Sequence, residues 1–373
     1  MKKAFSVGVV ISCAPLCAFA QSSISLYGTL DESIQYVHNT DGKSTKIGLQ
    51  GSQYSSNKWG LTGTEDLGGG LSAIFKLESG FDINSGKSSS GLLFSRRAYV
   101  GIKSDTYGSI TFGRQFDALS DLVTEVQPNW YQYYFTAPGD VDNADGSITV
   151  NNAVKWTSPN FHGLRVVSTY SFGGVAGSTG SGQAYTAAAA YTWNKAEFAA
   201  GYMHIDNGNA VLSSRGTTAV TGLFSSVVNS AYSSASSINI ARAGANYNLS
   251  PFIIGGYYSY SEYLADGHST FHTAERYSNA SVYAVYQLNP AAQFEVGYDF
   301  LKSHGDSSAT YHQVSISGDY LISKSTDFYL SLGYGHASGN NGYGTAQAVI
   351  ADSFPDAGKS TQELAIVGMR HRF

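Results

Sequence analysis

The chain has 373 residues, a formal net charge of −5 and an isoelectric point near 6.0. This acidic balance excludes the broad basic face that a nucleic-acid-binding protein needs. Only 13% of the residues are charged, about half the usual share in a soluble domain. The 42 Gly, 27 Tyr and 19 Phe residues are typical of a protein with many hairpins and aromatic belts.

The first residues have the pattern of a secretion signal. A basic pair, Lys2-Lys3, precedes the apolar stretch from Phe5 to Ala14, and Ala18-Phe19-Ala20 forms a small-x-small cleavage site. We therefore predict a signal peptide over residues 1–20 and one mature domain over residues 21–373. Both cysteines lie in this leader, so the mature chain offers no disulfide and no thiolate metal site. We predict neither a cofactor nor a metal.

After the leader, the chain consists of stretches of about ten residues in which apolar and polar side chains alternate, as in membrane-spanning strands. The clearest stretches are 280–288, 294–300 and 328–334. A shift of one residue would turn Glu295 and Asp299 toward lipid, so the alternation sets the register. No stretch after the leader has the roughly 18 consecutive apolar residues of a spanning helix.

Short segments with turn-forming residues separate these strands. Seven such turns are expected, at residues 65–70, 105–108, 158–160, 193–195, 248–251, 289–290 and 323–325. Longer polar loops alternate with them, among them residues 85–91, 173–182, 206–237 and 338–359. Seven tight turns with long loops between them predict sixteen strands. We therefore predict an all-β fold, a sixteen-stranded antiparallel transmembrane β-barrel with short periplasmic turns, long extracellular loops and a water-filled lumen.

The loop from Asp117 to Asn151 differs from the others because it contains the aromatic run Trp130-Tyr131-Gln132-Tyr133-Tyr134-Phe135. Aromatic side chains on a solvated tip would expose a large apolar surface, so the run is expected to pack against something. It either covers a neighbouring part of the wall or folds into the lumen. A loop folded inward would narrow the channel and set its size limit.

Several motifs lie in a characteristic order along the mature chain. They are Ser25-Leu26-Tyr27-Gly28 with Asp31, then residues 58–61, 63–71, 75–81, 94–101 and 108–115, and the end Gly368-Met369-Arg370-His371-Arg372-Phe373. With this order and spacing the chain resembles the sixteen-stranded trimeric general porins of Gram-negative bacteria, in particular their β-proteobacterial branch. The resemblance implies a homotrimer in the outer membrane, surrounded by lipid and lipopolysaccharide. It also implies a third external loop bent into each pore, with basic residues on the wall and acidic residues on that loop.

Lys58 and Arg96 match the family's basic wall at the pore constriction. Lys58 stands where the family usually has Arg, which keeps the charge but loses the planar fork of the guanidinium. Lys155 is a further candidate, because alternation places Val154 and Trp156 on the opposite, lipid-facing side. The acidic partners on the loop are expected among Asp117, Asp121, Glu125 and Asp140.

Alternation also places Asp31, Arg165 and Arg242 on the lumen face. A charge that faced lipid at mid-depth would cost roughly 2–4 kcal/mol. For Arg165 and Arg242 we favour the simpler interpretation, in which they are solvated wall residues away from the constriction. Arg97 and Arg114 are expected to have structural roles in rim or subunit contacts.

The last strand alternates to the C-terminal residue, with Ala365, Val367, Met369, His371 and Phe373 on one face. This strand has to pair with the first one, because an open sheet edge in lipid leaves backbone groups unsatisfied. The resemblance implies that the outer-membrane insertion machinery recognises this strand and its terminal Phe373.

These features favour a passive diffusion channel for small hydrophilic solutes and ions, not an enzyme. The acidic chain would favour cations at the mouths, whereas the basic wall would favour anions at the narrowest point, where the field is concentrated. We predict a weak preference for anions. One alternative is a sugar-selective channel of the same architecture that uses residues 130–135. A barrel enzyme is less favoured, because the sequence has no G-x-S-x-G motif, and a soluble secreted β protein would not explain the lipid-facing stripes.

Overall fold

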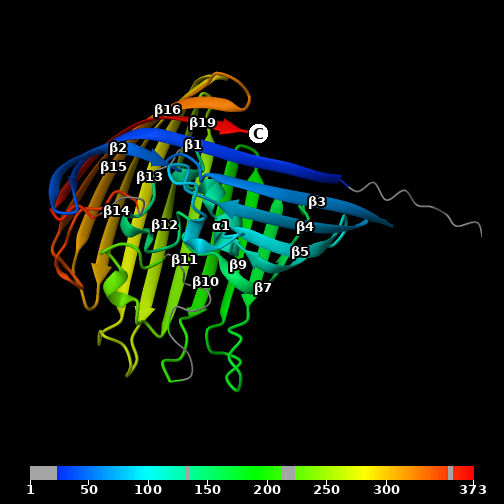
Figure 1. The fold of residues 1–373 in the computed structure, drawn as a ribbon, viewed down its shortest axis with the longest axis horizontal. Coiled ribbons are helices and arrows are strands. Elements are labelled where there is room, and N and C mark those ends of the chain that lie inside the picture. The colour runs from blue at the N-terminus through cyan, green and yellow to red at the C-terminus, as the bar shows by residue number, and fades with distance from the viewer. Residues whose placement is uncertain (1–22, 132–134, 212–214, 216–222, 352–355) are drawn as a thin grey trace, which may run out of the picture.

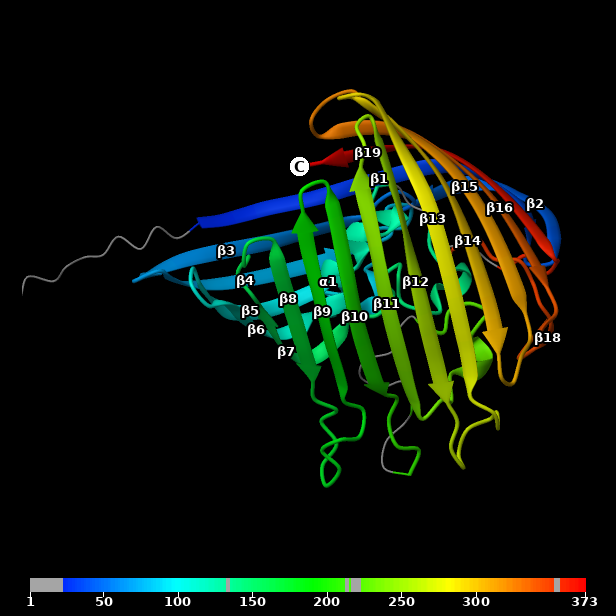
Figure 2. The ribbon, with the colours of Figure 1, turned by 180° about the vertical axis from the view of Figure 1, so that it is seen from behind.

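The computed structural model describes residues 23–131, 135–211, 215, 223–351 and 356–373. The predicted leader and residues 132–134, at the centre of the aromatic run, lie outside the described residues. The chain forms a barrel of long antiparallel strands that follow one another around the wall (Figures 1 and 2).

The elements of the described chain are almost all strands. The wall consists of β1 (Ser23–Thr40), β2 (Lys43–Gly51), β3 (Lys58–Gly68), β4 (Leu71–Gly80), β5 (Arg97–Ser104), β6 (Gly108–Gln115), β7 (Val150–Thr157), β8 (Leu164–Ser171), β9 (Ala184–Trp193), β10 (Ala196–Asp206), β11 (Ser237–Asn248), β12 (Phe252–Leu264), β13 (Glu275–Asn289), β14 (Ala292–His304), β15 (Thr310–Leu321), β16 (Thr326–Ser338) and β19 (Thr361–Arg372). A separate hairpin pairs β17 (Asn340–Asn341) with β18 (Gly344–Thr345). The helices are α1 (Ala118–Leu122) and the 3-10 turns η1 (Ser89–Gly91), η2 (Thr124–Val126), η3 (Pro128–Trp130), η4 (Pro138–Asp140) and η5 (Ser230–Tyr232).

The barrel closes where β1 pairs with β19. Within the described residues the sheet has 17 strands. However, β2 and β3 both pair with β1, one after the other, and so share one position in the wall. The predicted sixteen-stranded barrel is confirmed. At the seam, the backbones of Gly28 and Phe373 exchange hydrogen bonds of 2.9 and 3.1 Å. A Cβ atom at Gly28 would overlap the ring of Phe373, so the last aromatic residue rests on a glycine.

The predicted alternation is confirmed by burial. Phe294 and Val296 are 50% and 49% exposed on the outer face, whereas Glu295 and Asp299 are 2% and 1% exposed on the inner face. All seven predicted turns fall between consecutive strands on one rim. On the opposite rim, the connections at residues 41–42 and 305–309 are also short, so short and long connections do not alternate strictly. No helix among the described residues is long and apolar enough to cross a membrane.

The third long loop, residues 116–149 and called loop 3 below, folds into the lumen. Figure 1 shows α1 enclosed by the ring of strands. The side chains of Leu119, Val123, Phe135 and Ile148 are fully buried, and α1 packs on β8, β9 and β10. The prediction of an inward-folded loop is confirmed. The aromatic run divides: Phe135 is buried against Gly297, whereas Trp130 remains 57% exposed.

Two other loops differ from the expectation of polar external loops. In residues 206–237 and 338–359, described side chains such as Leu223, Tyr232 and Ile350 are fully buried. They pack toward loop 3, and the Gly139 N–H donates to the Ala351 carbonyl over 2.8 Å. The reason is their scattered apolar residues, which bury surface once loop 3 provides a partner inside the barrel.

Residues 52–57 interrupt the alternation between β2 and β3 and form a short insert on the lumen side, called the insert below. Asp31 holds it in place, because its carboxylate accepts hydrogen bonds from the N–H groups of Gln53, Tyr54 and Ser55 at 3.2, 3.0 and 2.7 Å. Asp31 faces the lumen side, as expected, but it is fully buried and serves the backbone of the insert. An ionised carboxylate with several backbone donors is a strong local clamp.

Candidate pore constriction

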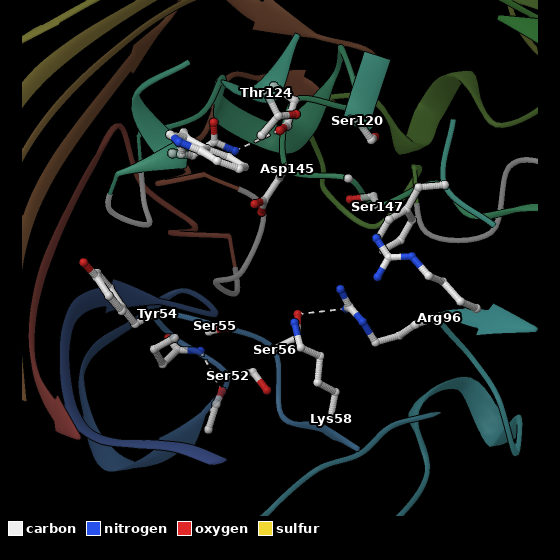
Figure 3. Close-up of a pocket in the computed structure, with 18 of the residues that line it drawn as sticks. Ser52, Tyr54, Ser55, Ser56, Lys58, Arg96, Ser120, Thr124, Asp145 and Ser147 are labelled. Carbon is white, nitrogen blue, oxygen red and sulfur yellow. Dashed lines mark hydrogen bonds between the residues drawn. The ribbon is translucent and has the colours of Figure 1, made fainter. Parts of the chain in front are cut away.

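A cavity of about 660 Å³ lies in the lumen between loop 3, the insert and the start of β5. Figure 3 shows Ser120, Thr124, Asp145 and Ser147 of loop 3 on one side of it. Across the cavity lie side chains of the insert and the wall: Tyr54, Ser55, Ser56, Lys58 and Arg96. Loop 3 therefore leaves an opening on this side of the barrel, with hydroxyl groups on both edges.

The wall side is organised around one carboxylate, Glu78 on β4. Arg96 donates from Nε and Arg97 from Nη1 to the same Glu78 oxygen, both over 2.9 Å. Tyr27 donates to the other oxygen over 2.8 Å, and it reaches across Gly60, where a Cβ atom would meet its hydroxyl. Glu78 is only 1% exposed, so its negative charge is screened from the cavity by these donors.

Lys58 adds a third cation to this wall. Its side chain projects from β3 into the same cavity, and its ammonium makes no hydrogen bond or ion pair within the part of the chain that the structure describes. Arg97 also lies over the ring of Phe116, with its guanidinium carbon 4.2 Å from the ring centre. Three cations thus face the cavity around a single carboxylate, which leaves the wall with an excess of positive charge.

The insert and loop 3 are joined through Tyr54. Its hydroxyl donates to the Tyr131 carbonyl over 3.1 Å, and its ring stacks on Tyr329 with centroids 4.8 Å apart. Arg370 of β19 lies 4.2 Å from the centre of the Tyr54 ring. On the other side of the insert, Ser56 accepts a hydrogen bond from Arg96 over 2.9 Å. These contacts fix the edge of the opening from the last strand to the tip of loop 3.

Two of the four acidic residues proposed for the loop side turn into loop 3 itself. Asp117 caps α1 by accepting from the N–H groups of Leu119 and Ser120 at 2.8 and 3.1 Å. Asp140 accepts from the Asp145 N–H over 2.9 Å. Both carboxylates are buried and neither lines the cavity.

The other two acids join loop 3 to β7 and β8, the part of the wall next to β5 and β6. Asp121 forms an ion pair with Lys155 of β7, and Glu125 pairs with Arg165 of β8 through both guanidinium nitrogens. Burial raises the pKa of the Asp121 carboxyl, and the Lys155 ammonium opposes that shift. Neither pair lines the cavity, so the structure places Lys155 with the loop anchors and apart from Lys58 and Arg96.

Two residues that line the cavity were not predicted from the sequence to be constriction residues. Arg97 was assigned to rim or subunit contacts, but it lines the cavity beside Arg96. Alternation could have found it, because Val100 is 60% exposed on the outer face and Arg97 lies three residues earlier, on the inner face. Asp145 lines the loop side. It follows the sharp turn of η4, and no local pattern distinguishes it from the other loop acids.

The remaining arginines lie outside the cavity. Arg242 is 1% exposed behind loop 3 and donates to Gln127 over 3.4 Å. Arg114 donates to the Ser95 carbonyl over 2.7 Å and to Asn151 over 2.5 Å, which anchors the base of loop 3. Among the described residues no group of three or more His, Cys, Asp or Glu side chains could hold a metal ion.

Comparisons with known proteins agree with this architecture. The profile of the Gram-negative porin family matches residues 7–340. The outer membrane porin protein 32 of Delftia acidovorans is 27% identical over 390 aligned residues, which cover 100% of both chains. An outer membrane porin protein of Bordetella pertussis is 31% identical over 186 residues, 46% of this chain and 48% of that one.

Among solved structures, the anion-selective porin from Comamonas acidovorans superposes with a TM-score of 0.73. It is 23% identical, and the match covers 95% of this chain and 100% of that one. The trimer form of OmpT from Vibrio cholerae superposes with a TM-score of 0.67 at 16% identity, over 94% of this chain and 99% of that one. At these identities the superpositions bear on the fold alone.

Proposed function

Because this chain belongs to the family of Gram-negative porins, we propose that its channel passes small hydrophilic solutes by passive diffusion and prefers anions. The barrel is an outer-membrane porin, and its outer face carries the apolar side chains that lipid requires. Which solutes pass and which sign of ion is preferred depends on the charges of the constriction.

One observation carries the anion preference. Lys58, Arg96 and Arg97 face the cavity, and Glu78 is the carboxylate that Arg96 and Arg97 share. On the opposite edge, Asp145 is the acidic residue that lines the cavity. An excess of fixed positive charge in a narrow opening with low-dielectric walls raises the local concentration of anions. The anion-selective porin from Comamonas acidovorans, which shares the fold, has the sign that we propose here.

We further propose that the chain assembles as a trimer. The Vibrio cholerae relative of the same fold is recorded in a trimer form. The expected result is an oligomer three times the mass of the monomer by light scattering in detergent, which dissociates on heating. A monomer at all concentrations in mild detergent would overturn this part of the proposal.

The test of selectivity is the reversal potential of single channels in a planar bilayer with a tenfold gradient of potassium chloride. The wild type is expected to give the sign of a chloride-preferring pore. Neutralising Lys58 by Lys58→Gln removes one charge from the opening. A unit charge about 4 Å from an ion contributes about 1 kcal/mol in water-like surroundings. Because the charge attracts anions and repels cations, the ratio of anion to cation permeability should fall by at least about fivefold.

The matched control is Lys46→Gln, which makes the same charge change on the exposed strand β2, away from the cavity. It should leave the reversal potential within error of the wild type. A wild type with cation preference, or equal effects of the two variants, would contradict the assignment of selectivity to this wall. No conductance at all would contradict the channel itself.

A further inference from the structure

Trp130 is unusual among the residues that line the constriction. It is 57% exposed and lines the same cavity as Lys58 and Arg96. Its ring has no aromatic or cation–π partner within the described residues. A large aromatic side chain normally buries its faces against other groups, whereas this indole presents its surface to the space through which solutes pass.

The backbone on either side of Trp130 is firmly held. The side chain of Asn129 donates to the Ala144 carbonyl over 2.9 Å, and the Trp130 N–H donates to the Gln127 carbonyl over 3.2 Å. The next residue, Tyr131, is bound through its carbonyl to Tyr54 over 3.1 Å. The exposure of the indole is therefore not the consequence of a loose tip; the loop holds it at the edge of the cavity.

The other aromatic rings of the cavity already have partners. The Tyr54 ring stacks on Tyr329 and lies against the Arg370 guanidinium, and Phe116 lies under Arg97. Trp130 is thus the cavity ring left for a solute in the described part of the chain. Lys58 lines the same cavity from the barrel wall. Its ammonium also has no hydrogen-bond or ion-pair partner in the described part, so it remains available to an anionic group.

From this arrangement we propose that the constriction selects small anions that carry a flat ring, such as aromatic carboxylates. The carboxylate is held by Lys58 and Arg96, and the ring stacks on Trp130. The cavity volume of about 660 Å³ is within the range of roughly 300–1,000 Å³ that is typical of small-molecule sites. Offset stacking and edge contacts of aromatic rings favour a flat aromatic solute over a saturated ring of the same size. This inference rests on the proposed function and names the solute class for the same opening.

The experiment measures block of the chloride current by benzoate and by cyclohexanecarboxylate, two monoanions of similar size. In the wild type, benzoate is expected to block at about a three- to tenfold lower concentration, the range of one aromatic contact. In Trp130→Ala the two anions should become equal, while the chloride preference in potassium chloride alone persists. Trp130→Phe should retain part of the difference.

Trp193→Ala is the matched control, because Trp193 is 60% exposed at the end of β9 and does not line the cavity. It should behave like the wild type. Equal block by both anions in the wild type, or a benzoate preference that survives in Trp130→Ala, would overturn the inference while the anion channel still stands. Block by a neutral sugar without any preference for benzoate would also overturn it, in favour of a sugar-selective channel. Loss of chloride preference in the wild type would instead contradict the proposed function.

Discussion

Two groups of charges lie in neighbouring parts of the wall, and they are balanced in opposite ways: one on β3 to β5 beside the cavity, the near wall, and one on β7 and β8, the far wall. On the far wall, Lys155 has Asp121 and Arg165 has Glu125, one acid for each base. On the near wall, Arg96 and Arg97 share Glu78, and Lys58 stands beside them without a partner in the described chain. Charges are matched where loop 3 must be held and are in excess where the cavity opens. The matched pairs at Lys155 and Arg165 therefore anchor loop 3, whereas the unbalanced bases at Lys58, Arg96 and Arg97 are proposed to select ions.

The largest effect is expected when the near wall loses its paired arginines. In Arg96→Gln/Arg97→Gln, Glu78 stays 1% exposed but has no cation beside it except Lys58. Removing the partners of a buried charge typically costs about 3–5 kcal/mol. We expect lower resistance to unfolding in urea and a shift of the reversal potential toward cation preference. The triple variant that also carries Glu78→Gln should regain most of the stability, and a triple variant as unstable as the double one would contradict this explanation.

The next effect comes from breaking a pair on the far wall. Asp121→Asn leaves Lys155, which is 7% exposed, without its counter-charge. We expect loop 3 to be destabilised by about 1–3 kcal/mol, the usual cost of an unsatisfied buried group, and the current to become noisier. Lys155→Met in the same background should restore a quiet channel, since both charges are then gone. Unchanged noise in the single variant would show that this ion pair does not hold the loop.

Acidification should gradually remove the negative charge of Asp121 from the Asp121–Lys155 pair. Burial raises the pKa of Asp121, so its protonation begins above the ordinary range for Asp, near 3.9. Loss of the Asp121 charge has two opposing effects on stability. The fold favours the neutral carboxyl, a contribution that is present below the unfolded-state pKa and lost as the pH rises through the folded-state pKa, whereas the buried Lys155 loses its counter-charge. As the pH falls, the Asp121 carboxyl takes up its proton at a higher pH than an ordinary Asp does, which removes a negative charge from loop 3. The anion preference should therefore increase more in the wild type than in Asp121→Asn, as read from reversal potentials at each pH.

The smallest effect is expected for the second anchor. The side chains of Arg165 and Glu125 are 32% and 21% exposed, and solvent-exposed ion pairs contribute about 0–1 kcal/mol. Glu125→Gln should change the unfolding midpoint little and the permeability ratio less than Lys58→Gln does. A change in selectivity as large as that of Lys58→Gln would mean that both walls select ions, and the contrast between the walls would not hold.

Much of the barrel could be predicted from the sequence, because its strands obey a local rule. Lipid on one face and polar surroundings on the other force alternation residue by residue, as at Phe294 and Glu295. Turn residues mark where each strand ends, and the terminal Phe373 indicates the seam with the first strand. The inward fold of loop 3 was implied by the family resemblance, because the aromatic run alone left a neighbouring part of the wall as an alternative.

The interior was harder to predict. The insert at residues 52–57 has a local signal, a Ser/Asn-rich break in the alternation, but its position depends on Asp31, more than twenty residues earlier. No local sequence pattern indicated which carboxylates of loop 3 would reach the cavity. Asp117 and Asp140 serve the loop backbone, whereas Asp145 reaches the cavity, because the turns of loop 3 decide which carboxylate meets which partner.

The sequence by itself therefore determined the strand register, the sixteen-stranded wall and the presence of basic residues on its inner face. Each follows from the solvent that a side chain meets along a strand, and that solvent alternates with a period of two. Only the tertiary structure decided which bases are neutralised and which remain to meet a solute. An ion pair depends on the distance between side chains far apart in the chain, as for Lys155 with Asp121 and for Lys58, which has none in the described chain.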